Sequence, residues 1–366
     1  MGQIEALSQV VIYDNPVPTL RSRHGFFPGI ARVPSGDLVA LVSIGEAFES
    51  NDQQTFIVRS TDRGRTWRMQ GPLHREQRRG LGSLKPTLIE NGALIAVGYM
   101  FYRDNPDTLV NPDTGGLPGG DNLVSFSTDE GRTWSLPVRM DLTRPEILEL
   151  AGPCIQLRGS GELLALASPL TRWDGTRPSG NVGIVLRSKN RGLSWNDRGL
   201  YFDHPGIMPL EARVCQMEDG RVVGIVWALD EERGVALNNH LVVSRDEGKT
   251  WSPPTDIGIA AQASNLLPLR GNQLLSIHAH RECEPTGVIV RLCALAANDG
   301  WTTLTELNLW DRAVAKRVTG FGDMGTNLKF GQPALLALGD SEYLAYHWSI
   351  ENGQGRILGH RIRVHE

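Results

Sequence analysis

Cysteine is scarce in this chain of 366 residues, and long apolar runs are missing from it. Four cysteines do not make a disulfide framework at this length, and no two of them have CxxC spacing. We therefore expect reduced, mostly buried thiols at Cys154, Cys215, Cys283 and Cys293. No apolar run approaches the ~20 residues that span a bilayer. The N-terminal MGQIEALSQV has no basic region followed by an apolar stretch, as a signal peptide would. These features predict a cytoplasmic protein with no membrane partner.

Charge of one sign is not in excess either. The chain has 37 Lys and Arg residues against 41 Asp and Glu residues, a formal charge of −4. A nucleic-acid binder shows a basic face or stripe, so this balance predicts no nucleic-acid partner. The sequence contains neither a GxxxxGKS/T loop nor a strand-flanked GxGxxG motif, and we expect no nucleotide. We predict no other cofactor and no metal.

One eight-residue pattern recurs along the chain. It reads STDRGRTW at 60–67, STDEGRTW at 127–134, SKNRGLSW at 188–195 and SRDEGKTW at 244–251, with a shorter copy, ANDGW, at 297–301. Each copy is typical of a hairpin turn: Asp or Asn bonds the backbone two residues on, Gly supplies a positive φ, and Trp packs back on the strands. Four near-complete copies indicate a fold of repeated units.

A second pattern lies between these turns: a short apolar strand, a tight polar turn and another apolar strand. It occurs at 29–42, 86–99, 153–167, 213–227, 265–280 and 333–348, and a further strand completes each unit. No long stretch has helical period, so we expect few helices. Radial repetition of four-stranded sheets is the β-propeller arrangement. We predict an all-β, six-bladed β-propeller as one domain over 1–366, with segments 9–14 and 356–364 sharing the closing blade.

Repeated S-x-D-x-G-x-T-W turns, called Asp boxes, on a six-bladed propeller resemble the sialidase (neuraminidase) superfamily. The resemblance covers nearly the full length of the chain and implies a carbohydrate partner. The boxes are specific for the fold and not for the reaction, because such turns are structural and a fold does not decide function.

The strand order of a blade predicts which face carries the chemistry. If strands A to D run from the axis outward, the approach to strand A and the B–C loop share one face, and the A–B turns and Asp boxes share the other. The approaches carry Arg23, His24, Lys85, Glu149, Glu211, Arg213, Lys329 and Gln332. The B ends and B–C loops carry Glu46, Glu49, Asp52, Arg103, Trp173, His278, His280, Arg281 and His347. The longest loop, 102–121, ends at Asp121 and is typical of a functional loop or lid.

Charged groups that converge near the axis must be paired or must serve a ligand. We therefore predict a binding site there. Its candidate catalytic residues are Glu211, Asp52, Glu46, His24 and His280. Its candidate substrate-binding residues are Arg23, Lys85, Arg103, Asp121, Trp173, Arg213, His278, Arg281, Lys329 and His347.

Strand alternation places His278 and His280 on one side, opposite Ile277 and Ala279. Three interpretations stay open for this pair. The histidines could face the central funnel and move protons or bond sugar hydroxyls. They could ligate a metal, although no third ligand lies nearby in the sequence. They could also be satisfied inside the blade.

The resemblance implies three arginines that hold the substrate carboxylate, a Tyr nucleophile with a Glu base, and an Asp acid. Glu211 matches the Glu, and Asp52 matches the acid, with Glu46 and Glu49 competing. The chain departs from the pattern elsewhere. Phe26 stands at the first arginine, Trp227 at the second, and Phe330-Gly-Gln-Pro333 where the Tyr is expected.

Three functions follow from this incomplete set. The leading one is a glycoside hydrolase for a sugar other than sialic acid, neutral or anionic. Glu211 and a blade-1 acid, Asp52 or Glu46, would form its carboxylate pair, with room for a water between them and therefore inversion. The second is a lyase in which a cation neutralises a uronate and His removes the neighbouring proton. The third is a non-catalytic glycan- or protein-binding propeller.

Overall fold

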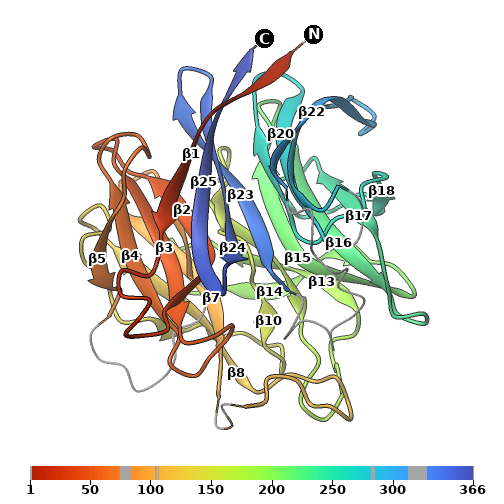
Figure 1. Ribbon diagram of the computed structural model, residues 1–366. Helices are drawn as coiled ribbons and strands as arrows, with labels where there is room; N and C mark the ends of the chain where they lie inside the picture. Colours follow the sequence, from red (N-terminus) through yellow and green to blue (C-terminus); the bar gives the residue numbers. More distant parts are fainter. Residues whose placement is uncertain are drawn as a thin grey trace.

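The computed structural model describes residues 2–74, 84–103, 105, 107–281, 285–311 and 328–365, and Cys283 lies outside these ranges. Within them the chain forms six antiparallel sheets arranged radially, the predicted six-bladed β-propeller (Figure 1). The three cysteines that are described are free and buried. No helix in the described ranges is long and apolar enough to cross a membrane.

The first three blades follow one another along the chain. Blade 1 consists of β2 (His24–Arg32), β3 (Leu38–Gly45), β4 (Gln54–Ser60) and β5 (Arg68–Pro72). Blade 2 consists of β6 (Leu84–Leu88), β7 (Leu94–Phe101), β8 (Gly120–Ser127) and β9 (Val138–Arg139). Blade 3 has its innermost strand in two pieces, β10 (Leu148–Glu149) and β11 (Ile155–Gln156), followed by β12 (Leu163–Pro169), β13 (Val182–Ser188) and β14 (Asn196–Asp203).

The last three blades close the circle. Blade 4 consists of β15 (Ile207–Gln216), β16 (Val222–Asp230), β17 (Val235–Ser244) and β18 (Thr255–Asp256). Blade 5 consists of β19 (Ser264–Pro268), β20 (Gln273–His280), β21 (Gly287–Leu295) and β22 (Trp301–Asp311). Blade 6 consists of β23 (Phe330–Gly339), β24 (Glu342–Glu351), β25 (Gln354–His365) and, outermost, β1 (Gln3–Tyr13). Figure 1 shows β1 in red beside β25 in blue, and the two strands pair from Gln3↔His365 to Tyr13↔Ile357.

The apolar core is divided into layers between neighbouring blades. Leu41 of blade 1 and Leu94 of blade 2 share one layer, and Ile277 of blade 5 and Phe330 of blade 6 share another. The second strand of a blade has such a layer on each side, which explains why all eight residues of β3 are buried. Burying one such side chain stabilises the fold by about 1.5–3 kcal/mol.

Each Asp box closes the turn between strands C and D. In the first box, Asp62 accepts hydrogen bonds from Thr66 N at 2.9 Å and Thr66 Oγ1 at 2.6 Å. Trp67 Nε1 donates to Gly64 O at 3.2 Å, so the indole packs back over the turn. The carboxylate reaches four residues on rather than the expected two. Arg63 has a positive φ of 60° in addition to Gly64, so the left-handed stretch is two residues long.

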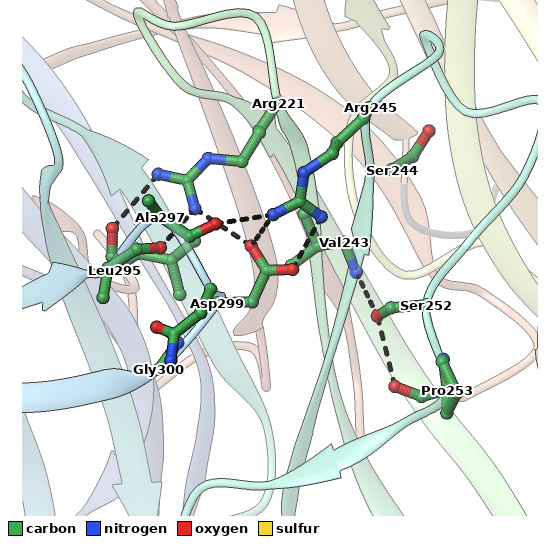
Figure 2. A network of polar contacts seen from close by, with 12 residues as sticks. Arg221, Val243, Ser244, Arg245, Ser252, Pro253, Leu295, Ala297, Asp299 and Gly300 are labelled. Carbon is green, nitrogen blue, oxygen red and sulfur yellow. Dashed lines mark hydrogen bonds and ion pairs between the residues drawn. The ribbon is translucent and has the colours of Figure 1, made fainter.

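In the shorter fifth copy, the carboxylate accepts hydrogen bonds from arginines of the neighbouring blade. Asp299 accepts hydrogen bonds from Arg245 at 2.7 and 2.9 Å and from Arg221 Nη1 at 3.0 Å (Figure 2). Arg221 is buried, and both arginines belong to blade 4. This copy therefore ties blade 4 to blade 5.

Short turns occupy the Asp-box face of the propeller. Ser35 N in the β2–β3 turn donates to Glu130 Oε1 of the second box at 3.1 Å. Ser160 N in the β11–β12 turn donates to Glu247 Oε1 of the fourth box at the same distance, 3.1 Å. The A–B turns and the boxes therefore share one face, as predicted, and the longer B–C loops lie on the other.

We predict that the box carboxylates contribute measurably to stability. Burial raises the pKa of Asp129, but hydrogen bonds from Thr133 and Ser127 outweigh it and hold this pKa at about 2. Asp129→Ala should lower the free energy of unfolding in urea by about 1–3 kcal/mol. Asp129→Asn should cost less, because Asn190 fills this position in blade 3 and accepts from Ser194 N at 2.9 Å. Equal losses in the two variants would contradict this account.

Candidate functional site

The six blades enclose a small cavity on the propeller axis. Its volume is about 110 Å³, and every blade contributes to its lining. Five blades do so through their innermost strand, and blade 3 does so through Ala151 and Pro153, which lie between β10 and β11. Apolar and backbone groups form most of the wall. Its polar side chains come from Lys85, Arg213, Asn265, Gln332 and Tyr346. The cationic residues at this depth are almost fully buried, with exposures of 2% for Lys85 and 4% for Arg213.

Three innermost strands are interrupted at matching places. The ladders of β2, β15 and β23 each shift register, and Phe27, Glu211 and Gln332 have positive φ values of 49°, 47° and 42° within those shifts. Non-glycine residues in this conformation store strain and cluster at functional sites. Such bulges re-aim side chains next to active sites.

The bulges bring blades 4 and 6 together at the axis. Gln332 Nε2 donates to Glu211 Oε1 at 3.0 Å, and Trp227 Nε1 donates to Glu211 Oε2, also at 3.0 Å. Arg213 Nη1 donates to Glu211 O at 3.0 Å. Both carboxylate oxygens are therefore held by donors from different strands, and the side chain has one orientation. Glu211 is 9% exposed.

A second carboxyl group lies beside Glu211. Glu149, at the end of β10, accepts a hydrogen bond from Glu211 N at 2.9 Å through Oε2. Burial, with the charge of Glu211 adding to it, raises the pKa of Glu149 to about 7 against the opposing effects of that hydrogen bond, Arg213 and Arg177. Near neutral pH this carboxyl is therefore poised between its two forms.

A third carboxyl group comes from the β3–β4 loop of blade 1. Burial raises the pKa of Glu49 to about 7, while Arg103 and Lys85 act in the opposite direction. Arg103 Nη1 donates to Glu49 O. Burial and the charge of Arg213 lower the pKa of Lys85 well below its usual range, although Glu211 and Glu49 oppose that change. Lys85 Nζ donates to Phe27 O at 2.5 Å.

Tyr99 lies among these three carboxyl groups. Burial raises its pKa well above 10, and Glu49, Glu149 and Glu211 all add to the effect. The phenol is therefore neutral and keeps its proton for donation. The cluster as a whole joins three carboxyls to a phenol and two buried cations.

The structure thus brings together four of the residues predicted from sequence: Glu211, Arg213, Lys85 and Arg103. The other two blade-1 candidates are placed differently. Asp52 Oδ1 accepts from Glu46 N at 2.9 Å and from Ser50 Oγ at 2.6 Å, so it stabilises its own loop. Glu46 is exposed. Glu49 takes the place near the axis instead.

The predicted pair Arg23 and His24 lies at the start of blade 1. His24 Nδ1 accepts from Gly355 N at 2.8 Å, and its Nε2 lies 2.9 Å from Ser22 Oγ. Burial lowers the pKa of His24. The Arg23 guanidinium lies over the Phe56 ring, 5.8 Å from its centroid. These contacts join the approach of blade 1 to the β24–β25 turn.

His278 and His280 share one side of β20, as alternation predicted, with ring centroids 6.3 Å apart. Both nitrogens of the fully buried His278 are engaged, Nδ1 with Ser264 Oγ and Nε2 with Ser276 Oγ, each at 2.8 Å. His280 Nε2 lies 3.1 Å from Arg291 Nη1. Burial and Arg291 lower the pKa of His280 to about 4. The pair therefore fits the interpretation of histidines satisfied inside the blade.

The remaining central candidates line the junction of blades 5 and 6. Arg281 is buried, and its Nε donates to Phe330 O at 2.9 Å. Lys329 is half-buried, and its carbonyl accepts from Ile350 N at 2.6 Å. His347 is fully buried and stacks on His360 with ring centroids 5.3 Å apart.

Asp121 and Trp173 lie away from the axis. Asp121 forms an ion pair with Arg139 at 3.3 Å, and the Trp173 side chain is 43% exposed. Both line a cleft of about 490 Å³ between blades 2 and 3, on the face of the B–C loops. Among the described residues, no group of three or more His, Cys, Asp or Glu side chains could hold a metal ion.

The departures from the sialidase pattern have clear packing reasons. Phe26 is buried against Phe48 and Trp348, with ring centroids 5.5 and 5.4 Å away, so an aromatic cluster fills the place of the first arginine. Trp227, at the second, binds Glu211 directly. Glu149 and Gln332 were not selected as site residues from sequence. The sequence pattern placed both on the approach to an apolar innermost strand, which is the rule that selected Glu211, and this was the available signal. In the structure Glu211 and Gln332 lie within β15 and β23, at the register shifts of those strands.

No protein-family model matches the chain, and no curated protein matches it significantly. Solved structures do match. A protein of unknown function from Dyadobacter fermentans superimposes with a TM-score of 0.78 at 19% identity, over 99% of both chains. The Hadza microbial sialidase Hz136 gives 0.67 at 16% identity, over 96% of this chain and 68% of its own. The intramolecular trans-sialidase from Ruminococcus gnavus gives 0.61 at 14% identity, over 97% and 96%. The chain therefore has the sialidase fold, as the Asp boxes indicated.

The buried pair His347 and His360 predicts a loss of stability in mild acid. His347 Nδ1 lies 3.1 Å from Trp348 O and must donate to it, so its Nε2 accepts the proton of His360 Nε2 at 3.2 Å. Burial, with His360 adding, lowers the pKa of His347 to about 3, and burial lowers that of His360 to about 4. Unfolded histidines bind protons near pH 6.5. The contribution of this pair to stability is therefore complete above about pH 6.5 and is lost as the pH drops towards 4.

We expect the free energy of unfolding to fall by up to about 1.4 kcal/mol per pH unit for each of the two histidines. Urea titrations between pH 6.5 and 5 measure this slope. His360→Leu should make it shallower by the share of that histidine, while His280 and His278, whose pKa values burial also lowers, continue to contribute. His204→Gln, at an exposed histidine, should leave the slope unchanged. An unaltered slope in His360→Leu would contradict the assignment.

Proposed function

We propose that this protein hydrolyses a glycosidic bond, with Glu211 as general base and Glu49 as general acid. The observation that carries the proposal is the axial carboxylate of Glu211, held by Gln332 and Trp227 at 3.0 Å each and surrounded by carboxyls with raised pKa values. Solved sialidases share the fold, which supports a carbohydrate ligand. Paired carboxyl groups with separated roles are the usual means of glycoside hydrolysis.

The contacts of Glu211 fit the role of general base. Trp227 and Gln332 fix its two oxygens by hydrogen bonds. Gln332 Oε1 is buried without a hydrogen-bond partner in the described parts of the chain. An acceptor in that position can orient a water beside Glu211 Oε1. The water then attacks the anomeric carbon while its proton passes to Glu211, and the bond to the leaving oxygen breaks.

Glu49 suits the part of the acid. Its raised pKa of about 7 keeps a substantial protonated fraction near neutral pH, and this proton passes to the leaving oxygen. Blades 1 and 4 lie opposite each other in a six-bladed propeller, so Glu49 and Glu211 approach a sugar from two sides. We propose that they act with a water between them, and a hydrolase of this type inverts the anomeric centre.

The sugar we propose is not sialic acid. Phe26 and Trp227 stand at two of the three arginine positions that the resemblance implies, and Gln332 lies in the segment where the tyrosine is expected. Lys85 and Arg213 supply the cationic floor, which suits a hydroxyl-rich or singly anionic sugar. Tyr99 keeps its phenolic proton for a hydroxyl or ring oxygen.

The uronate lyase has less support from the site. His278 has both ring nitrogens occupied, and His24 Nδ1 accepts a backbone hydrogen bond. A binding propeller without turnover is an outcome of the first test below.

The first test is a turnover screen on neutral and acidic oligosaccharides, with Glu211→Gln in parallel. We expect new reducing ends without the ultraviolet absorbance of an unsaturated uronate, and a loss of at least about 10²-fold in the variant. Absorbance would favour the lyase. Binding without turnover across the panel would favour the non-catalytic alternative, and full activity in Glu211→Gln would remove it from the mechanism.

The second test identifies the acid. Glu49→Gln should lower kcat/KM by about 10²–10⁴-fold on a glycoside with a poor leaving group and far less on its 2,4-dinitrophenyl analogue, which departs without a proton. Activity of the unaltered protein should fall above about pH 7, because the acid works only when protonated, and Glu49→Gln should lack this limb. Asp52→Asn is the matched control, for which we expect a smaller loss that is equal on both substrates. The reverse ranking would assign the acid to Asp52.

A further inference from the structure

The cleft between blades 2 and 3 opens on the same face as the axial cluster. It is lined by the ends of the β7–β8 and β12–β13 loops and by the segment that leads from β9 to β10. In Figure 1 these loops extend at the lower edge of the molecule, below β8 and β10. Its volume of about 490 Å³ lies within the range of small-molecule sites.

The wall of the cleft is fixed by contacts between the two loops. Leu117 N donates to Thr171 O at 2.9 Å. Asn111 Nδ2 and Thr114 Oγ1 both donate to Trp173 O, each at 2.8 Å. These bonds use the backbone of Trp173 and leave its indole exposed. The loops of neighbouring blades therefore form one preorganised surface.

The cleft is continuous along the chain with the axial cluster. Tyr102 lines it, and the next residue, Arg103, binds Glu49 O. Ile147 lines it two residues before Glu149. On the opposite side, Arg177 Nη2 donates to Thr171 Oγ1 at 2.5 Å, and the charge of Arg177 acts on Glu149. A ligand that extends from the axis over blades 2 and 3 would enter this cleft.

The lining combines flat aromatic faces with cations. The Trp173 and Tyr102 side chains are 43% and 37% exposed. Aromatic rings of this kind present large apolar faces for stacking, with a polar end in water. Arg139, Arg144 and Arg172 lie around them. Arg172 is exposed, and its charge adds to the hydrogen bonds from Thr176 that lower the pKa of Asp174. No hydrogen bond or ion pair joins the Arg172 guanidinium to another of the described residues.

The acids of the cleft are already engaged by the protein. Glu146 accepts from Ser179 N at 2.6 Å and from Ser179 Oγ at 2.8 Å. Asp174 accepts from Thr176 N at 3.0 Å and Thr176 Oγ1 at 2.6 Å, and Asp121 pairs with Arg139. Arg139 is paired with Asp121, and Arg144 Nε donates to Asp197 O at 3.3 Å. A ligand therefore meets the Arg172 guanidinium as a donor, beside carboxylates that the protein already engages, which favours an anionic group.

We propose that this cleft binds the further units of an acidic saccharide chain, whose terminal unit lies at the axis. Trp173 stacks on a sugar ring, and Arg172 pairs with a ring carboxylate. The inference rests on the proposed hydrolase and narrows its substrate class to oligosaccharides that contain uronate units. It requires no chemistry in the cleft itself.

Binding is measured by calorimetry in the Glu211→Gln background, so that no turnover is needed. The probes are oligogalacturonates and oligomannuronates of one to five units, with cello-oligosaccharides of equal length as neutral counterparts. We expect Kd for an acidic series to fall at least tenfold between one and four units. Trp173→Ala should abolish this gain and leave the affinity for the single unit within twofold, because the loop contacts use only the Trp173 backbone. Arg172→Gln should reduce the preference for acidic over neutral chains.

Leu193→Ala is the matched control, at a residue that is 78% exposed in the third Asp box on the other face. It should change none of these values. Affinity that does not depend on chain length, or a length gain that survives in Trp173→Ala, would overturn the proposal.

Turnover by the protein that retains Glu211 distinguishes the proposed cleft site from the proposed hydrolase. Trp173-dependent binding of acidic chains without any hydrolysis would leave the cleft assigned and remove the hydrolase. If both the Trp173→Ala protein and the unaltered protein hydrolyse all chain lengths with equal kcat/KM, the hydrolase would stand and the cleft proposal would be wrong.

Discussion

Packing between neighbouring blades is the constraint on which the rest of this structure depends. Each blade is apolar on both sides of its second strand, and it buries those sides only when a further blade lies against each of them. The circle closes through strand β1, which pairs with β25 and places both ends of the described chain in one blade. Polar side chains are therefore located at the outer surface and at the axis.

The axis is where the sheets depart from regular geometry. Glu211 and Gln332 lie in register shifts of two different blades, and the positive φ of each is offset by the packing of the strands around it. Their hydrogen bond joins blade 4 to blade 6 across the centre. A regular innermost strand would alternate its side chains between the two inter-blade layers. The bulges therefore turn a carboxylate and an amide out of the apolar layers.

Burial of several charges at one place gives the site its electrostatic character. Glu49 and Glu149 have pKa values raised to about 7, whereas burial lowers those of Lys85 and Arg213. Glu49 and Glu149 thus exchange protons near neutrality, while the carboxylate of Glu211 accepts hydrogen bonds from the neutral side chains of Trp227 and Gln332. Outside this cluster, the cleft beside Trp173 is more open and carries exposed arginines. The two regions suit different parts of one extended ligand.

Much of the fold was predictable from the sequence because its signals are local. An Asp box is completed within eight residues, so its letters alone indicate the turn, and the spacing of the boxes indicates the blades. The same rule of strand order selected Glu211, Arg213 and Lys85, which do meet. The sequence by itself therefore determined the propeller, the face with the long loops and the floor of the site. Tertiary structure decided which blade-1 acid approaches the axis, because Asp52 bonds its own loop and leaves Glu49 to face Lys85. It also decided that His278 is satisfied by two serines inside blade 5, because alternation along a strand does not reveal which neighbours cover each side.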